Sequence, residues 1–307
     1  MRIDLNGRVA IVTGAGGGLG RAHALLLAKR GARVVVNDLG GARDGSGAST
    51  TMAEQVVEDI RAAGGEAIAN GASVTEYDQV EAMADQAMAA WGRIDILVNN
   101  AGILRDRTFA KQPLEDFRTV VDVHLMGSVN CTKAVWDIMA AQGFGRVLLT
   151  TSSSGLYGNF GQSQYGAAKL GLVGLMKTLS QEGRKHDIRV NCLAPSAATR
   201  MTADIMGEDA LAALDPASVS PGMLALVCNE APSGMIMCAG GGSFEAAHIT
   251  LTRGIHVGAG EDAPEGVLAG LDRIRDRTGE TVPATGLEQS HHELALGGLL
   301  QPALADG

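Results

Sequence analysis

The chain has 307 residues, of which 46% are hydrophobic and only 3% aromatic, so its core must consist mainly of Ala, Val, Leu and Ile. Its 34 acidic and 25 basic residues give a net charge of −9, which disfavours nucleic acid or an anionic membrane as a partner. The four cysteines are widely spaced and form no C-x-x-C pair, so the sequence suggests neither a zinc site nor a disulfide framework. We expect them to be reduced thiols, most of them buried.

Short apolar runs alternate with helical stretches along the chain, which is the pattern of βαβ units in a doubly wound parallel sheet. Strands are expected at 9–12, 34–36, 94–98, 147–150, 188–193 and 234–238. Helices are expected at 19–30, 52–63, 76–91, 113–142 and 155–185, with a further short helix at 264–277. We predict a Rossmann-like α/β fold with one catalytic domain, 1–257, and a C-terminal extension, 258–307.

A glycine-rich segment, TGAGGGLG at 13–20, follows the first predicted strand. With Gly14, Gly18 and Gly20 it can form a tight turn whose backbone approaches a pyrophosphate at the start of a helix. Asp38 lies 24 residues after Gly14, where a carboxylate can accept hydrogen bonds from ribose hydroxyls and repel a 2′-phosphate. The pattern therefore predicts a nucleotide site that favours NAD over NADP. The alternative interpretation of the glycine segment is a turn with a purely structural role. A second glycine-rich loop, at 40–48, is longer than a tight βα turn requires.

Tyr165 and Lys169 are four residues apart, just over one helical turn, so the phenol and the ammonium project from one helix face. A lysine charge beside the phenol favours phenolate and should lower the pKa of Tyr165 from about 10. Ser152 lies thirteen residues before Tyr165, in a cluster of three serines. A Tyr-x-x-x-Lys pair alone is a weak signal, because it can equally be an exposed helical pair. The order of the motifs makes the functional interpretation stronger.

This order, with NNAG at 99–102 between the glycine loop and the serines, resembles the short-chain dehydrogenase/reductase family, most densely from residue 8 to about 205. Three stretches are similar to the (3R)-hydroxyacyl-CoA dehydrogenase part of peroxisomal multifunctional enzymes: NDLGG at 37–41, GILRDR at 102–107 and YGNFGQ at 157–162. The resemblance implies NAD-dependent interconversion of a secondary alcohol and a ketone in a 3-hydroxyacyl-CoA or hydroxysteroid. Reduction of an acyl-carrier-protein ester or small carbonyl, and a catalytically silent nucleotide sensor or scaffold, are the alternatives.

By this resemblance, Tyr165 exchanges a proton with the substrate, Lys169 lowers the pKa of Tyr165 and holds the nicotinamide ribose, and Ser152 hydrogen-bonds the substrate oxygen. The resemblance implies further cofactor contacts at Leu19, Asn99, Ala101, Gly102, Pro195 and Ser196. Ser196 stands where the family usually has Gly, so the contact that the resemblance implies for it is one of its backbone with the nicotinamide.

His124 departs from the family, which usually has Asn at this place, before Leu-x-Gly. The Asn acts mainly through its backbone carbonyl, which holds a water in a proton relay. His124 is therefore either the fourth catalytic residue or a core histidine whose ring is satisfied by neighbours. The sequence favours neither interpretation.

The segment 196–229 follows the strand after which the family places its substrate cover, and it carries Met201, Met206 and Met223. Flexible thioethers suit a bulky apolar ligand, but they fill cores equally well. Three basic residues, Arg105, Arg107 and Lys111, either meet CoA phosphates or carry ordinary solvated charge.

Small residues along the helix that carries Tyr165 allow close packing, and the resemblance implies a homodimer or homotetramer built on that helix. These residues are Ala167, Ala168, Gly171 and Gly174. The apolar run at 9–12 is too short for a signal peptide, and no run reaches the length of a membrane span. We therefore expect a cytoplasmic protein.

Overall fold

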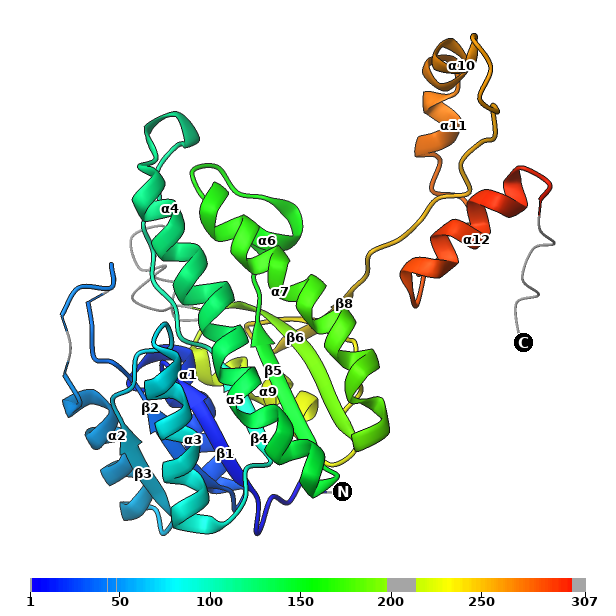
Figure 1. Cartoon of the computed structure of the whole chain (residues 1–307). Coiled ribbons are helices and arrows are strands. Elements are labelled where there is room, and N and C mark those ends of the chain that lie inside the picture. Colours follow the sequence, from blue (N-terminus) through cyan, green and yellow to red (C-terminus); the bar gives the residue numbers. More distant parts are fainter. Residues whose placement is uncertain (1, 43, 48, 198–213, 300–307) are drawn as a thin grey trace. The chain divides into compact units, whose positions relative to one another are not determined.

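The computed structural model describes residues 2–42, 44–47, 49–197 and 214–299 (Figure 1). The chain divides into two compact units, Met1–Ala246 and Ala247–Gly307. The predicted division into domains, 1–257 and 258–307, stays a prediction, because two compact units need not be two folding domains. Among the described residues, no helix is both long and apolar enough to cross a bilayer, and the cytoplasmic location stays a prediction.

A single sheet with strand order β3-β2-β1-β4-β5-β6-β7-β8 forms the first unit, and every pair from β3 to β7 is parallel. The strands are β1 Val9–Thr13, β2 Arg33–Asn37, β3 Ala67–Asn70, β4 Ile96–Asn99, β5 Gly145–Thr150, β6 Ile188–Ser196, β7 Ile236–Gly240 and β8 Ser243–Ala247. This is the predicted doubly wound fold. The strand order reverses between β1 and β4, and such a switch point leaves a crevice at the carboxyl ends of the strands.

Helices cover both faces of the sheet (Figure 1). In the first unit they are α1 Gly18–Lys29, α2 Thr51–Ala62, α3 Tyr77–Trp91, α4 Leu114–Val121, α5 Gly127–Gln142, α6 Ser153–Tyr157, α7 Ser163–Glu182 and α9 Ser220–Val227. Short 3₁₀ turns lie at Phe109–Lys111, Gly183–His186 and Pro216–Ser218. On one face α1 packs against α2 and α9, and on the other α3 packs against α5, and α4 against α7. The second unit holds α10 Ala263–Ala269, α11 Leu271–Arg275 and α12 Gly286–Leu296.

Three predicted helices differ from the observed ones, and four elements were not predicted: β3, α9, β8 and α12. The helix expected at 155–185 is broken after α6, because Gly158 and Gly161 have φ of +79° and +80°, which only glycine adopts easily. The helix expected at 113–142 contains a π-helical turn at Asp122–Met126. The helix expected at 264–277 is split into α10 and α11.

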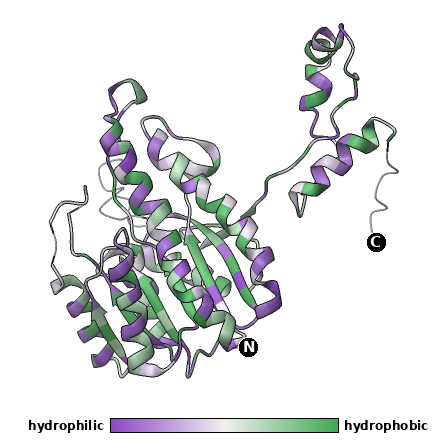
Figure 2. Cartoon of the chain, viewed as in Figure 1, coloured by the Kyte–Doolittle hydropathy of each residue, from purple (hydrophilic) through white to green (hydrophobic). Residues whose placement is uncertain are grey.

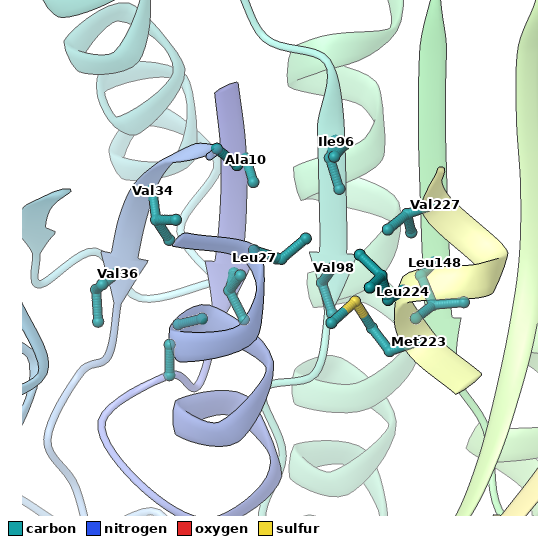
Figure 3. Close-up of a cluster of buried hydrophobic side chains, with 14 of the residues drawn as sticks. Ala10, Leu27, Val34, Val36, Ile96, Val98, Leu148, Met223, Leu224 and Val227 are labelled. Atoms are coloured by element: carbon teal, nitrogen blue, oxygen red, sulfur yellow. The ribbon is translucent and has the colours of Figure 1, made fainter. Parts of the chain in front are cut away.

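The core is an aliphatic layer between the sheet and its helices, as the low aromatic content predicts. Figure 2 shows hydrophobic residues along the strands, and Figure 3 shows side chains of β1, β2, β4, β5, α1 and α9 meeting in one cluster. Met223 lies in this cluster with no exposed surface, so core filling is confirmed for it. Met201 and Met206 lie outside the described residues. Three of the four cysteines are buried, as the sequence predicted, and their reduced state stays a prediction.

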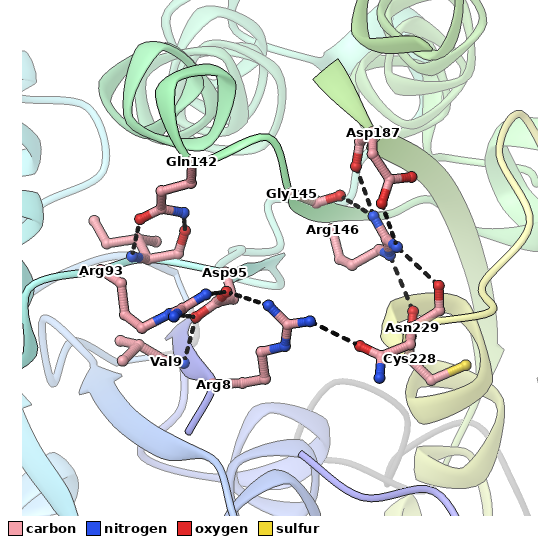
Figure 4. A network of polar contacts seen from close by, with 11 residues as sticks. Arg8, Val9, Arg93, Asp95, Gln142, Gly145, Arg146, Asp187, Cys228 and Asn229 are labelled. Carbon is pink, nitrogen blue, oxygen red and sulfur yellow. Dashed lines mark hydrogen bonds and ion pairs between the residues drawn. The ribbon is translucent and has the colours of Figure 1, made fainter. Parts of the chain in front are cut away.

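A polar network ties together the amino ends of the strands, opposite the crevice (Figure 4). The buried guanidinium of Arg146 donates to the carboxylate and carbonyl of Asp187 and to the carbonyls of Cys228 and Asn229. A second centre, the buried carboxylate of Asp95, accepts from Arg8 and Arg93. Since each of the two buried charges, Arg146 and Asp95, has an oppositely charged partner, the network stabilises the amino edge of the sheet.

Candidate active site

A cavity of about 400 Å³ lies at the carboxyl ends of the strands, where the strand order reverses. Its lining includes Gly14, Gly18 and Leu19 after β1, Asp38 after β2, Asn100, Ala101 and Gly102 after β4, Thr150 of β5, Tyr165 and Lys169 of α7, and Pro195 of β6. The glycine segment, Asp38, part of the NNAG motif and the Tyr165–Lys169 pair therefore share one cavity.

The glycine segment after β1 is shaped by close backbone approach. A Cβ on Gly14, whose φ is +63°, would lie 2.7 Å from the Cα of Ala101. A Cβ on Gly20 would overlap the carbonyl oxygen of Gly14. Helix α1 begins at Gly18 with no side-chain cap and no acidic residue in its first turn. Its first amides are therefore suited to a phosphate group.

Asp38 is held at the end of β2 by two backbone amides. Its Oδ2 accepts from the amide of Gly16 and its Oδ1 from the amide of Gly40, both at 2.7 Å. A carboxylate oxygen can accept more than one hydrogen bond, so both oxygens can also receive ribose hydroxyls. The donors and acceptors of this end of the cavity thus fit the adenosine and pyrophosphate of a dinucleotide.

After β4, the two neighbouring asparagines have different environments. The side-chain amide of Asn99 is buried and donates to the hydroxyl of Thr132 at 3.2 Å, and Asn99 is not among the lining residues. Its expected contact with the nucleotide, mostly through the backbone, stays a prediction. Asn100 lines the cavity instead, and its Nδ2 donates to the carbonyls of Thr13 and Gly14 at 3.0 Å each. Sequence reasoning missed Asn100, although it lies within the same NNAG motif.

Lys169 is buried on α7 beneath the cavity. Its Nζ donates to the carbonyl of Thr150 at 2.5 Å and lies 5.5 Å from the ring centroid of Tyr165. Burial lowers the pKa of Lys169 to about 7. Thr150 was not predicted, although its place at the end of β5, just before the serines, is a usable signal. The predicted convergence of Tyr165 and Lys169 on one side of α7 is present.

The predicted lowering of the pKa of Tyr165 is wrong for this structure. Burial of the phenol raises its pKa, a hydrogen bond with Ser152 opposes that rise, and the charge of Asp106 adds to it. The prediction considered only the neighbouring charge and not the loss of solvation. Tyr165 is therefore a protonated phenol at neutral pH.

Ser152 is the buried member of the serine cluster. It is the N-cap of α6, where its hydroxyl accepts from the amide of Ser154 at 3.1 Å, whereas Ser153 is exposed. The hydrogen bond with Tyr165 places its hydroxyl beside the phenol. The structure thus brings together Ser152, Tyr165 and Lys169 as the spacing predicted.

His124 lies in the π-helical turn Asp122–Met126, and its ring meets that of Tyr165 edge to face at 5.0 Å. Burial lowers the pKa of His124 to about 3, so the ring is neutral. Its Nε2 lies 2.8 Å from the carbonyl oxygen of Ile103 and 3.1 Å from the amide nitrogen of the same residue, and the tautomer of the ring decides which of these two hydrogen bonds it makes. Its backbone carbonyl accepts from Ser128 at 2.7 Å. The ring occupies the space where Gly102 would carry a Cβ.

Of the two predicted residues at the end of β6, one lines the cavity and the other does not. Pro195 lines the cavity, and Ser196 pairs with Gly240 of β7 at the end of β6. Arg105 makes an ion pair with Asp116, so it is not a free surface cation.

A model of the short chain dehydrogenase family matches residues 8–209. A putative short-chain type dehydrogenase/reductase of Mycobacterium tuberculosis is 51% identical over 240 residues, 78% of this chain and 84% of the relative. Peroxisomal multifunctional enzyme type 2 of the mouse is 52% identical over 231 residues, 74% of this chain but only 30% of the relative's length. The solved structure of 7α-hydroxysteroid dehydrogenase with NADH and 7-oxo glycochenodeoxycholic acid is 29% identical with a TM-score of 0.70, and the match covers 78% of this chain and 95% of that one.

Proposed function

Because this chain belongs to the short-chain dehydrogenase family, we propose that it is an NAD-dependent oxidoreductase acting on a secondary alcohol or its ketone. The observation that carries the proposal is one cavity that joins the glycine segment and Asp38 to Tyr165 and Lys169. A 3-hydroxyacyl-CoA or a hydroxysteroid is the proposed substrate. Similarity to a multifunctional enzyme type 2 and to a hydroxysteroid dehydrogenase supports this choice.

NAD, when bound, supplies the hydride acceptor for the alcohol carbon. The first turn of α1 would hold the pyrophosphate, Asp38 the adenosine ribose, and Lys169 the nicotinamide ribose. Tyr165 would take the alcohol proton during oxidation and return it during reduction, and Ser152 would hydrogen-bond the substrate oxygen as charge develops on it. His124 would support this group through its contact with the ring of Tyr165.

The first test is cofactor choice. Because the carboxylate of Asp38 would face the 2′-phosphate of NADP, NAD should bind more tightly by at least about 1.4 kcal/mol, a factor of ten. Titration of protein fluorescence with each dinucleotide measures the difference, and Asp38→Ala should narrow it. Equal affinities in the wild-type protein would refute the proposal that Asp38 selects NAD.

A second test identifies the substrate. In an apolar pocket each added methylene improves transition-state binding by up to about 0.8 kcal/mol until the pocket is full, so kcat/KM should rise from short to long 3-hydroxyacyl-CoA chains. NAD reduction is followed with that series and with hydroxysteroids. A flat or falling series, together with no steroid turnover, would favour a dehydrogenase of small alcohols instead. Activity only with NADPH and an acyl-carrier-protein ester would favour the reductase alternative, and binding without any turnover would favour a sensor.

We also propose that the chain forms a homodimer or homotetramer through the face of α7. Leu170 of α7 and Leu114 at the start of α4 are 46% and 68% exposed, although their helices pack side by side. Such an apolar face is suited to a second copy of the chain. Light scattering at micromolar concentration should give at least twice the monomer mass. A purely monomeric mass would contradict the proposal.

A further inference from the structure

The loop after β2 forms one wall of the cavity. We name its described residues, 39–42 and 44–47, the adenosine-side loop. Four of them line the cavity: Leu39, Gly41, Ala42 and Gly45. The base of the loop is fixed, because Gly40 donates to the carboxylate of Asp38 at 2.7 Å. The position of the loop is thus linked to the residue that we propose holds the ribose.

The tip of the adenosine-side loop is held by an arginine from a distant part of the chain. The Nε of Arg105 donates to the carbonyl of Asp44 at 3.0 Å, and its Nη1 forms an ion pair with Asp116 of α4 at 2.7 Å. Arg105 and Asp116 are 28% and 23% exposed, so this pair is partly shielded from solvent. Two different nitrogens of the planar guanidinium thus serve the two partners at once, in a geometry that a compact ammonium group does not reproduce.

Few other contacts hold the tip. A Cβ on Gly45, whose φ is +89°, would lie 3.2 Å from Ile103, so the loop packs on the segment after β4. Within the described part of the chain, the bond from Arg105 is the sole hydrogen bond between residues 41–47 and the rest of the protein. Without it, the remaining bonds of the tip are internal, such as the one from Ala42 to Ser46.

The backbone of Arg105 also contacts the catalytic helix. Its carbonyl accepts from the side chain of Gln164 at 2.8 Å, and Gln164 is fully buried and directly precedes Tyr165. A substitution of the Arg105 side chain leaves this backbone contact in place. It therefore tests the adenosine-side loop separately from the placement of Tyr165.

We infer that Arg105 is a positioning residue for the dinucleotide: it fixes the adenosine-side loop as a wall of the cavity and thereby sets affinity for the adenosine half. The inference rests on the proposed dinucleotide site. When the guanidinium is removed, the loop samples more conformations, and a ligand must then select or order the competent one. That requirement lowers affinity without changing the reacting groups.

The test compares Arg105→Met, which keeps the apolar stem, with Arg105→Lys and with Arg107→Met. Lysine should pair with the carboxylate of Asp116 rather than the neutral carbonyl of Asp44, because charge-assisted bonds are stronger. Arg107 is a matched control, since its exposed side chain has no hydrogen-bond or ion-pair partner among the described residues. Calorimetric titration with NAD and with ADP-ribose measures affinity, and turnover is measured at saturating NAD.

Both Arg105 variants should raise the Kd for NAD and for ADP-ribose about tenfold, with kcat within about twofold of wild type. The Arg107 variant should bind like wild type. A lower Tm with unchanged Kd would show a merely structural role and overturn the inference, as would full recovery of affinity by Arg105→Lys. If the wild-type protein binds NAD but the Arg105 variants bind it with unchanged affinity, the inference about Arg105 fails and the proposed function stands. If the wild-type protein binds no dinucleotide, the proposed function itself fails.

Discussion

Tyr165→Phe should reduce turnover about a thousandfold while changing the Kd for NAD less than about twofold. The substitution removes the phenolic proton but keeps the ring that packs against His124. The Ser152 hydroxyl and the Lys169 ammonium stay, yet neither replaces the phenol as the group that accepts the alcohol proton. Single-turnover assays with NAD and the best alcohol, together with NAD titrations, measure both quantities.

The pH profile provides a second measurement of the same prediction. Burial raises the pKa of Tyr165, so the phenolate needed for oxidation becomes more abundant as the pH rises, and alcohol oxidation should accelerate above neutral pH. The residual activity of Tyr165→Phe should lack this rise. Tyr77→Phe, at the start of α3, is the matched control and should behave like wild type. Turnover retained by Tyr165→Phe would mean that another acid or base does the work.

Lowering the pH from 6.5 to about 4.5 should destabilise the first unit strongly, because two neutral histidines are buried in it. His23 and His124 are 0% and 2% exposed, and burial lowers the pKa of each from 6.5 to about 3. Below pH 6.5 the unfolded chain binds protons at these rings, but the folded chain does not until about pH 3. As the pH is lowered from 6.5, the free energy of unfolding therefore decreases by up to about 1.4 kcal/mol per pH unit for each ring.

His23 allows this prediction to be tested away from the catalytic groups. Its Nδ1 lies 2.8 Å from the hydroxyl of Ser220, which joins α1 to α9. His23→Gln keeps a polar partner for Ser220 but cannot titrate, so the pH slope of stability should fall by about half. Urea unfolding followed by tryptophan fluorescence reports on the first unit, where both tryptophans lie. His291→Gln in α12 is the control, and equal slopes for wild type and His23→Gln would contradict the prediction.

The sequence alone determined the elements whose signal is local. Alternation of apolar runs and helical stretches predicted the parallel sheet, and the four-residue spacing placed Tyr165 and Lys169 on one side of α7. The glycine segment was recognisable because Gly14 must adopt a positive φ and lie close to Ala101, which few other residues tolerate. Each of these features depends on neighbours along the chain or on a backbone conformation that a residue type reveals.

The tertiary structure decided what depends on burial and on distant partners. It placed Met223 in the core, turned Asn99 away from the cavity, and reversed the expected pKa shift of Tyr165. It also joined Arg105 to a carbonyl 61 residues away. Desolvation and long-range hydrogen bonds arise only when remote segments pack together, so no window of sequence contains them.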